Sequence, residues 1–318
     1  MVVLKFGGKS LESEEKIYNV CEHIKFVCQT QKVVVVVSAI GDTTDKLFNF
    51  AQKFCKNCQN SREIDAILAA GEIISAGIVS QSLSDLGVKS ISKQAWQLDI
   101  IAMGKHGQAV ITGINKSKIL ELFKQYSVVV VTGFQAINKN GDICTIGRGG
   151  SDTSAVALGA VLGCEVEIYS NFDGIYAGDP SELNYKKLQQ IDFCTMQTLS
   201  NNGAKVLSAA SVDIARQANI NLVCKQSSCP QKSGTHISNV PIPFVGITTI
   251  DNLCEIDIIY NSNENNLQKT AKYIVQSVKY HKFCIKTNKI TLILKQSDKM
   301  MVLNELAKIN NLLEDWYV

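Results

Sequence analysis

Five consecutive valines, Val33–Val37, restrict the fold of this chain more than any other segment. Their β-branched side chains favour an extended backbone, and a strand that is apolar at every position must be covered on both faces. Such strands occupy the centre of parallel sheets that lie between two layers of helices. Further strand patterns at 2–6, 127–131, 166–169 and 220–224 alternate with helical patterns at 14–30, 70–86, 153–162, 195–199 and 211–218. The alternation predicts an α/β fold, an αβα sandwich with a mainly parallel central sheet.

A change of composition at 227–243, where turn-forming residues and prolines gather, predicts a domain boundary. We therefore expect a catalytic domain at 1–235 and a second domain at 244–318. The second segment has a βαββαβ pattern, with strands at 253–260, 282–286, 290–295 and 314–318 and helices at 267–278 and 300–309. This pattern predicts a small α+β domain with two helices on one face of its sheet.

The composition of the 318-residue chain limits the classes of function. The 32 Lys and Arg residues against 29 Asp and Glu give a net charge of +3, without the strong field expected of a nucleic-acid-binding protein. No run approaches the roughly 18 consecutive apolar residues of a membrane span, and the first residues lack the pattern of a secretory signal. We therefore expect a cytoplasmic protein. Cys55 and Cys58 have no second pair at zinc-finger spacing, so we expect no metal site in the protein itself.

Four segments carry residues suited to phosphate chemistry. Lys5-Phe6-Gly7-Gly8 ends the first strand, where ligands bind in open α/β sheets, and its glycines admit phosphate oxygens beside a lysine. The segment at 147–152 opens a helix whose exposed N–H groups favour an anion, and its arginine suits a carboxylate. A long turn at 170–180 follows a strand, and 202–205 joins a glycine to a lysine. Each alone could be an ordinary turn, a helix N-cap or a surface lysine, but together they indicate phosphoryl transfer.

The motifs, taken in order, resemble those of the aspartokinases of the amino-acid kinase family over residues 1–235. The combination of Gly-Arg-Gly-Gly-Ser-Asp with Ala-Gly-Glu separates aspartokinases from acetylglutamate and uridylate kinases, which share the fold. The matching motifs are Lys5-Phe6-Gly7-Gly8, Val36-Val37-Ser38-Ala39 with the segment at 43–47, Ala70-Gly71-Glu72, and the segments at 147–152 and 203–207.

The resemblance implies that ATP, with Mg²⁺ held chiefly by its phosphates, donates its γ-phosphoryl group to the β-carboxylate of L-aspartate. The product is 4-phospho-L-aspartate, the first intermediate toward lysine, threonine and methionine. The implied catalytic residues are Lys5 and Lys205, which contact the phosphates, and Asp152, which organises both lysines. The implied substrate-binding residues are Arg148 on a carboxylate, Glu72 on the α-ammonium group, and Ser38, Thr44 and Ser151 around them. The implied nucleotide-binding residues, besides the two lysines, are Gly7, Gly8, Ser170, Asn171, Tyr176, Asp179 and Gly203.

Some positions depart from the family pattern. Lys9 stands where Thr or Ser is usual, Asn171 replaces an Asp, and Ser181 stands where Arg is frequent. The C-terminal pattern resembles a single ACT domain, whereas aspartokinases generally carry two. It implies either a lysine or threonine effector or only a dimerisation surface, in a homodimer or higher homo-oligomer. Two other functions stay open: a different amino-acid kinase that forms an acyl phosphate, and a catalytically idle regulatory subunit.

Overall fold

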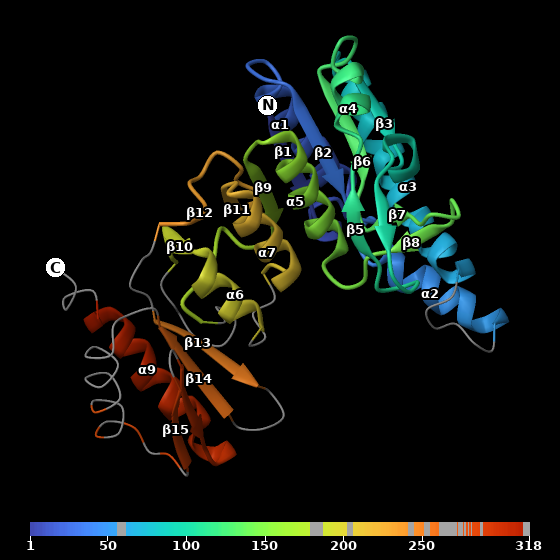
Figure 1. Cartoon of the computed structure of the whole chain (residues 1–318). Helices are drawn as coiled ribbons and strands as arrows, with labels where there is room; N and C mark the ends of the chain where they lie inside the picture. Colours follow the sequence, from blue (N-terminus) through green and yellow to red (C-terminus); the bar gives the residue numbers. More distant parts are fainter. Residues whose placement is uncertain are drawn as a thin grey trace. The chain divides into compact units, whose positions relative to one another are not determined.

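The chain divides into two compact units, which are described separately. The first unit comprises Met1–Asp173 and Asp213–Gly234, and the second comprises Gly174–Val212 and Thr235–Val318. The computed structural model (Figure 1) describes residues 1–55, 62–178, 187–201, 206–240, 245–250, 255–260, 272, 276, 278, 280, 282–286 and 289–313.

A parallel sheet forms the centre of the first unit, as the sequence predicts. Its strands run in the order β11-β9-β1-β2-β6-β3, and every neighbouring pair in this series is parallel. The strands are β1 (Val2–Phe6), β2 (Val33–Val37), β3 (Ser90–Lys93), β6 (Val128–Thr132), β9 (Val166–Ser170) and β11 (Leu222–Gln226).

The five valines form β2, between β1 and β6, and all five side chains are fully buried. Burial of one valine side chain contributes about 1.5–3 kcal/mol, so the five together contribute roughly 7–15 kcal/mol. The side chains of Val33, Val35 and Val37 pack in a cluster with residues of α1 and α3. Because side chains alternate along a strand, Val34 and Val36 face the opposite layer. The prediction of a strand covered on both faces is confirmed.

Helices cover both faces of this sheet (Figure 1). On one face α3 packs against β2, β3 and β6, and α1 packs against α3. On the other face α5 packs against β1, β2 and β9. The helix α3 begins at Arg62, eight residues before the predicted start at 70. The helices are α1 (Glu14–Val27), α2 (Thr43–Phe54), α3 (Arg62–Asp85), α4 (Lys116–Leu122) and α5 (Gly150–Leu162), and the 3₁₀ turns are η1 (Gly8–Ser10) and η2 (Ala95–Leu98). The helix α7 (Ala209–Ala218) has residues in both units.

A second, smaller sheet of the first unit has the order β5-β4-β7-β8. Its strands have only three or four residues, and the sequence pattern does not predict them. The predicted turn at 138–142 joins β7 to β8, where the N–H of Asn138 donates to the carbonyl of Asp142 at 2.9 Å. The strands are β4 (Ile101–Met103), β5 (Val110–Gly113), β7 (Gln135–Ile137) and β8 (Ile143–Thr145).

The helix α3 passes a test for a membrane span by length and composition, with a mean hydropathy of 1.5 over an 18-residue window. The expectation that no segment spans a membrane rested on runs of consecutive apolar residues, whereas α3 passes on its mean hydropathy. A buried core helix of a soluble protein passes the same test, and α3 contacts three strands of the central sheet. It also carries two almost fully buried carboxylates, Asp65 and Glu72, which line a cavity of the first unit. These contacts favour a core helix.

The second unit contains a four-stranded antiparallel sheet with the order β13-β14-β16-β15. The order of its last three strands agrees with the predicted ACT-like α+β fold, and α9 supplies a predicted helix. The strand β13 was not predicted, and neither was β12, which lies in the segment interpreted as a boundary. Most of the predicted helix at 267–278 and the strand at 314–318 lie outside the described residues. The elements are β10 (Gln190–Asp192) paired in parallel with β12 (Thr235–Ser238), α6 (Phe193–Asn201), β13 (Val245–Ile250), β14 (Glu255–Tyr260), β15 (Lys282–Lys286), β16 (Lys289–Ile293), η3 (Gln296–Asp298) and α9 (Lys299–Leu313).

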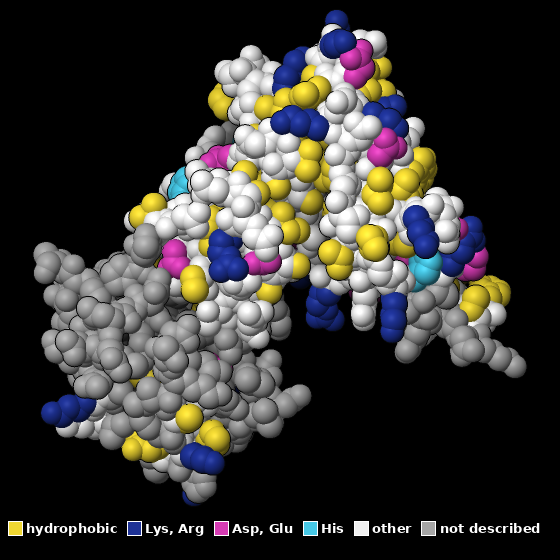
Figure 2. Space-filling model, viewed as in Figure 1, with side chains coloured by type: hydrophobic (Ala, Val, Ile, Leu, Met, Phe, Trp, Pro, Cys, Tyr) yellow, Lys and Arg dark blue, Asp and Glu magenta, His cyan; other side chains and the backbone are white. Residues whose placement is uncertain are grey.

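Charged side chains of both signs are interspersed over the described surface on the face shown in Figure 2. This distribution agrees with the small net charge of +3.

Candidate functional site

A cavity of about 490 Å³ in the first unit collects predicted site residues from five separate segments of the chain. It lies where β1 and β2 end, which is the edge of a parallel sheet at which ligands bind. The predicted residues that line it are Lys5, Ser38, Thr44, Glu72, Arg148, Ser151 and Asp152.

Lys5 and Asp152 form an ion pair at one side of this cavity. The Nζ atom of Lys5 lies 2.6 Å from Oδ1 of Asp152, and both side chains are mostly buried. Lys5 comes from the end of β1, and Asp152 lies in the first turn of α5, where a negative side chain is favoured by the helix dipole. The carboxylate therefore fixes the ammonium group in the cavity wall.

Glycines line the approach to this ion pair. Gly149 precedes α5 with a φ of +72°, and Gly147 has a φ of +84°, a region that favours glycine. A Cβ atom at Gly8 would lie 2.5 Å from the carbonyl oxygen of Ala39, so that position has no room for a side chain. The helix α5 begins at this wall with Gly150 and Ser151, and a helix N-terminus favours an anion.

Glu72 is an incompletely paired carboxylate within the cavity. Its side chain is 2% exposed, and its Oε1 atom accepts a hydrogen bond from the N–H of Ala39 at 2.9 Å. Its Oε2 atom is buried and has no hydrogen-bond partner among the residues that the structure describes. Burial raises the pKa of Glu72 to about 7, against an ordinary value of 4.5. A cationic ligand at Oε2 would restore the ionised form.

Neutral and cationic groups complete the cavity wall. Ser38 directly follows β2, and Thr44 lies in the first turn of α2. Arg148 is exposed on the glycine loop, and its planar guanidinium suits a bidentate contact with a carboxylate. The cavity thus combines two cations, a carboxylate with an unpaired oxygen and hydroxyl groups.

Sequence reasoning missed several residues of the cavity wall. Phe134 follows β6 with a φ of +66°, which is unusual for a residue with a side chain, and its N–H donates to Oγ of Ser154 at 3.1 Å. No local pattern announces this conformation. The other wall residues that were not predicted are Phe48, Ile64, Asp65, Leu68, Gly107 and Thr145.

Of the predicted nucleotide-binding residues, Lys5 lines the cavity, and a Cβ atom at Gly7 would lie 3.4 Å from its Nζ atom. The others are not among the residues that line the cavity, or lie outside the described structure. The carbonyl of Ser170 accepts a hydrogen bond from the N–H of Ser227 at 2.9 Å, and Asn171 is exposed. Tyr176 belongs to the second unit, where it forms an isolated bridge with Lys187. Asp179, Gly203 and Lys205, together with the departure at Ser181, lie outside the described residues. The roles of these residues stay predictions.

The amino acid kinase family matches residues 1–226, which is more than half of the chain and contains every residue of the cavity wall. The chain belongs to this family. Aspartokinases of Corynebacterium efficiens and Corynebacterium glutamicum are both 41% identical to it, over 71% and 79% of this chain. The chain spans only 55% and 61% of the length of these two relatives.

Solved structures of similar proteins confirm the fold of this amino acid kinase. Aspartokinase III of E. coli, in complex with aspartate and ADP, has a TM-score of 0.69 at 18% identity and covers 96% of this chain and 83% of its own. Aspartate kinase from Synechocystis has a TM-score of 0.66 at 28% identity and covers 98% of this chain and 56% of its own. Uridylate kinase from Archaeoglobus fulgidus, with a TM-score of 0.57 at 21% identity, covers 74% of this chain.

Proposed function

We propose that this amino acid kinase is an aspartate kinase, which transfers the γ-phosphoryl group of ATP to the β-carboxylate of L-aspartate. The observation that carries the proposal is the buried Glu72, which lines the same cavity as Arg148 and whose Oε2 atom has no hydrogen-bond partner among the described residues. Aspartate is a zwitterion with a second carboxylate, so its site needs an anion for the ammonium group and a cation for a carboxylate. Glu72 and Arg148 supply these groups, and Ser38 and Thr44 supply neutral donors.

The phosphoryl group would be transferred beside Lys5. An oxygen of the aspartate β-carboxylate attacks the γ-phosphorus, the bond from that phosphorus to the β,γ-bridging oxygen breaks, and ADP leaves with the electron pair. The β-carboxylate is already ionised at neutral pH, so the reaction needs no general base. Lys5 stabilises negative charge on the phosphates, Asp152 holds its ammonium group, and the N-terminus of α5 adds N–H donors. The predicted contribution of Lys205 is a second cation.

Mg²⁺ fits this site as a companion of ATP rather than as a resident ion. Asp152 is already paired with Lys5 at 2.6 Å, so the carboxylate nearest the proposed phosphate position is committed to that lysine. Mg²⁺ usually keeps several waters and binds through substrate phosphates with few protein ligands. When bound, the ion would neutralise charge on the β- and γ-phosphates.

The names of similar proteins support the choice of aspartate. The two Corynebacterium relatives are aspartokinases, and the E. coli enzyme was solved both with aspartate and ADP and with lysine and aspartate. We extend the proposal to the first reaction toward lysine, threonine and methionine, in the cytoplasm and in a homodimer or larger homo-oligomer. Lysine or threonine is the proposed effector of the ACT-like region.

An ADP-release assay tests the acceptor, with aspartate, glutamate, N-acetylglutamate and UMP offered in turn. We expect turnover with aspartate alone. A blocked amine would leave Glu72 without its cationic partner, and that loss disfavours N-acetylglutamate. Preference for another acceptor would refute the aspartate assignment, and no turnover with any acceptor would favour the idle regulatory subunit.

Arg148→Lys tests the proposed carboxylate contact. Lysine keeps the charge but loses the bidentate geometry, so we expect the KM for aspartate to rise about tenfold or more while the KM for ATP changes little. Arg216→Lys is the matched control, because Arg216 pairs with Asp213 on the exposed surface of α7. An unchanged KM for aspartate in Arg148→Lys would contradict the assigned role.

A further inference from the structure

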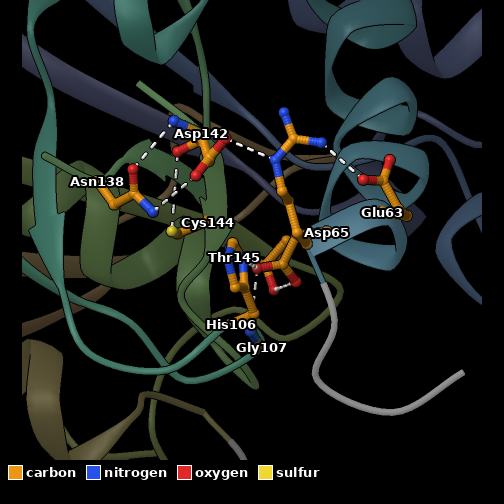
Figure 3. Close-up of polar contacts among 9 residues, drawn as sticks. Glu63, Asp65, His106, Gly107, Asn138, Asp142, Cys144 and Thr145 are labelled. Atoms are coloured by element: carbon orange, nitrogen blue, oxygen red, sulfur yellow. Dashed lines mark hydrogen bonds and ion pairs between the residues drawn. The ribbon is translucent and has the colours of Figure 1, made fainter. Parts of the chain in front are cut away.

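Three segments of the first unit meet at the carboxylate of Asp65, in the first turn of α3 (Figure 3). Its Oδ2 atom accepts hydrogen bonds from Nδ1 of His106 at 2.8 Å, from the N–H of Gly107 at 3.1 Å and from the N–H of Thr145 at 2.9 Å. Its Oδ1 atom accepts the hydroxyl of Thr145 at 2.7 Å. One side chain therefore joins α3 to the loop between β4 and β5 and to the end of β8.

The burial of Asp65 makes these four donors important. The residue is 1% exposed, and a buried carboxylate that loses a hydrogen-bond donor is strongly destabilised. A carboxylate can only accept, so Nδ1 of His106 carries the proton in this contact. Two of the four donors are backbone groups, so the position of Asp65 dictates the position of the chain at Gly107 and Thr145.

The loop that Asp65 holds continues into the site. Asp65, Gly107 and Thr145 all line the cavity. The carbonyl oxygen of Gly107 packs against Gly147, where a Cβ atom would lie 2.9 Å from it. Thr145 precedes Gly147 by two residues, and Arg148 follows directly. The backbone before Arg148 is thus held from both sides by groups that bind Asp65.

We propose that Asp65, with His106 and Thr145 as its side-chain donors, is a positioning residue that holds the loop of Arg148 in the geometry that binds the acceptor carboxylate. The identity of that acceptor rests on the proposed function, whereas the ordering of the loop does not. Asp65 acts through the backbone at Gly107 and Thr145, which in turn positions Gly147 and Arg148.

A metal site is the competing interpretation of the same residues. Asp65, His106 and Cys144 offer ligand atoms that lie within 4.8 Å of one another. However, the carboxylate oxygens already accept four hydrogen bonds, which a metal would have to displace. Burial also raises the pKa of the Cys144 thiol, and metal binding requires the thiolate. The four hydrogen bonds satisfy both carboxylate oxygens without an ion.

Paired substitutions separate positioning from general stability. Thr145→Val removes the hydroxyl that binds Asp65 and keeps the backbone N–H. His106→Ala removes the Nδ1 donor, and His106→Asn places an amide N–H near the same position. The matched control is Thr195→Val in the second unit, which removes a hydroxyl that binds the buried Asp192 at the same distance, 2.7 Å.

In the active enzyme we expect Thr145→Val and His106→Ala to raise the KM for aspartate about tenfold, because a displaced binding group costs affinity for its own ligand. The KM for ATP should stay within about twofold, and His106→Asn should recover most of the loss. Thr195→Val should leave both KM values unchanged. Equal rises of both KM values, with no recovery in His106→Asn, would overturn the proposal in favour of a purely structural role.

Amide hydrogen exchange of the ligand-free chain tests the positioning without any turnover. We expect faster exchange at 146–150 in Thr145→Val and His106→Ala than in the wild type or Thr195→Val. Unchanged exchange at 146–150 in these variants refutes the positioning role even if aspartate is the substrate. If exchange is faster but the chain does not phosphorylate aspartate, only the proposed function is refuted. Metal analysis completes the test, because a zinc ion retained by the wild type and lost in His106→Ala would replace our interpretation.

Discussion

Replacement of Glu72 by glutamine should make the chain more resistant to denaturant at alkaline pH, and hardly more resistant in acid. Burial raises the folded-state pKa of Glu72 to about 7, whereas the carboxyl group titrates near its ordinary value of 4.5 in the unfolded chain. The folded state therefore binds the proton more tightly. Its contribution to stability is present in full below the unfolded pKa and is lost as pH rises through the folded pKa.

The size of the effect follows from the two pKa values. Their difference corresponds to about 3 kcal/mol at high pH, and about 2.5 kcal/mol of this develops between about pH 5 and about pH 8. Glutamine keeps an oxygen for the N–H of Ala39 and cannot ionise. The unpaired amide group that it places at the position of Oε2 costs the same at both pH values and cancels in the comparison.

Urea unfolding of the wild type and Glu72→Gln at the two pH values measures this difference. The chain contains two tryptophans, so a Trp316→Phe background leaves Trp96, which lies in η2 of the first unit, as the fluorescent reporter. All other titrating groups are common to both proteins. A stability difference that changes by less than about 0.5 kcal/mol between the two pH values would refute the reasoning, because Glu72 would then be ionised and compensated in the folded chain.

Two further predictions concern Glu72 and the phosphate loop at Gly8. The KM for aspartate should rise about tenfold as pH falls from about 8 to about 6, because a protonated Glu72 cannot pair with the α-ammonium group. The KM for ATP should stay unchanged over the same range. Steady-state kinetics with each substrate varied measure both, and a KM for aspartate that does not depend on pH would contradict the role of Glu72. Gly8→Ala should displace the phosphate loop, because its Cβ atom would lie 2.5 Å from the carbonyl oxygen of Ala39 and 2.8 Å from that of Gly41. We expect a larger loss in ATP affinity than in aspartate affinity. Gly77→Ala is the control, since Gly77 has nothing within 4 Å of a Cβ atom, and it should stabilise α3 by about 0.5–1 kcal/mol. Equal ATP affinity in both variants would contradict the assignment of Gly8.

The sequence predicted β1, β2, β6, β9 and β11 of the central sheet because their evidence is local, but it did not predict β3, which pairs with β6. Val33–Val37 is apolar and β-branched at every position, which is typical of a strand covered on both faces. The small sheet at 101–145 was missed because strands of three or four residues show no periodicity. The strand Val245–Ile250 was missed for a different reason: Pro241 and Pro243 lie within four residues before its start and dominated the interpretation as a boundary.

The site could be predicted as far as sequence motifs extend. Lys5, Glu72 and Arg148 belong to motifs, and the parallel topology brings them together at one edge of the sheet. Asp65 lies 41 positions from His106 and 80 from Thr145, and no local pattern connects them. The left-handed backbone of Phe134 is likewise invisible, because the sequence offers no glycine there.

The two carboxylates of α3 show how one helix can serve both the scaffold and the site. Asp65 and Glu72 are seven residues apart, about two helical turns, so they lie on the same face and line the same cavity. Both are almost completely buried, but Asp65 accepts four hydrogen bonds whereas one oxygen of Glu72 is left without a partner among the described residues. A fully bonded carboxylate fixes the surrounding backbone, and an incompletely bonded one gains when a cation arrives. On the proposed function, an ammonium group at Glu72 would therefore stabilise its ionised form, while Asp65 holds the Arg148 loop in place to receive the carboxylate.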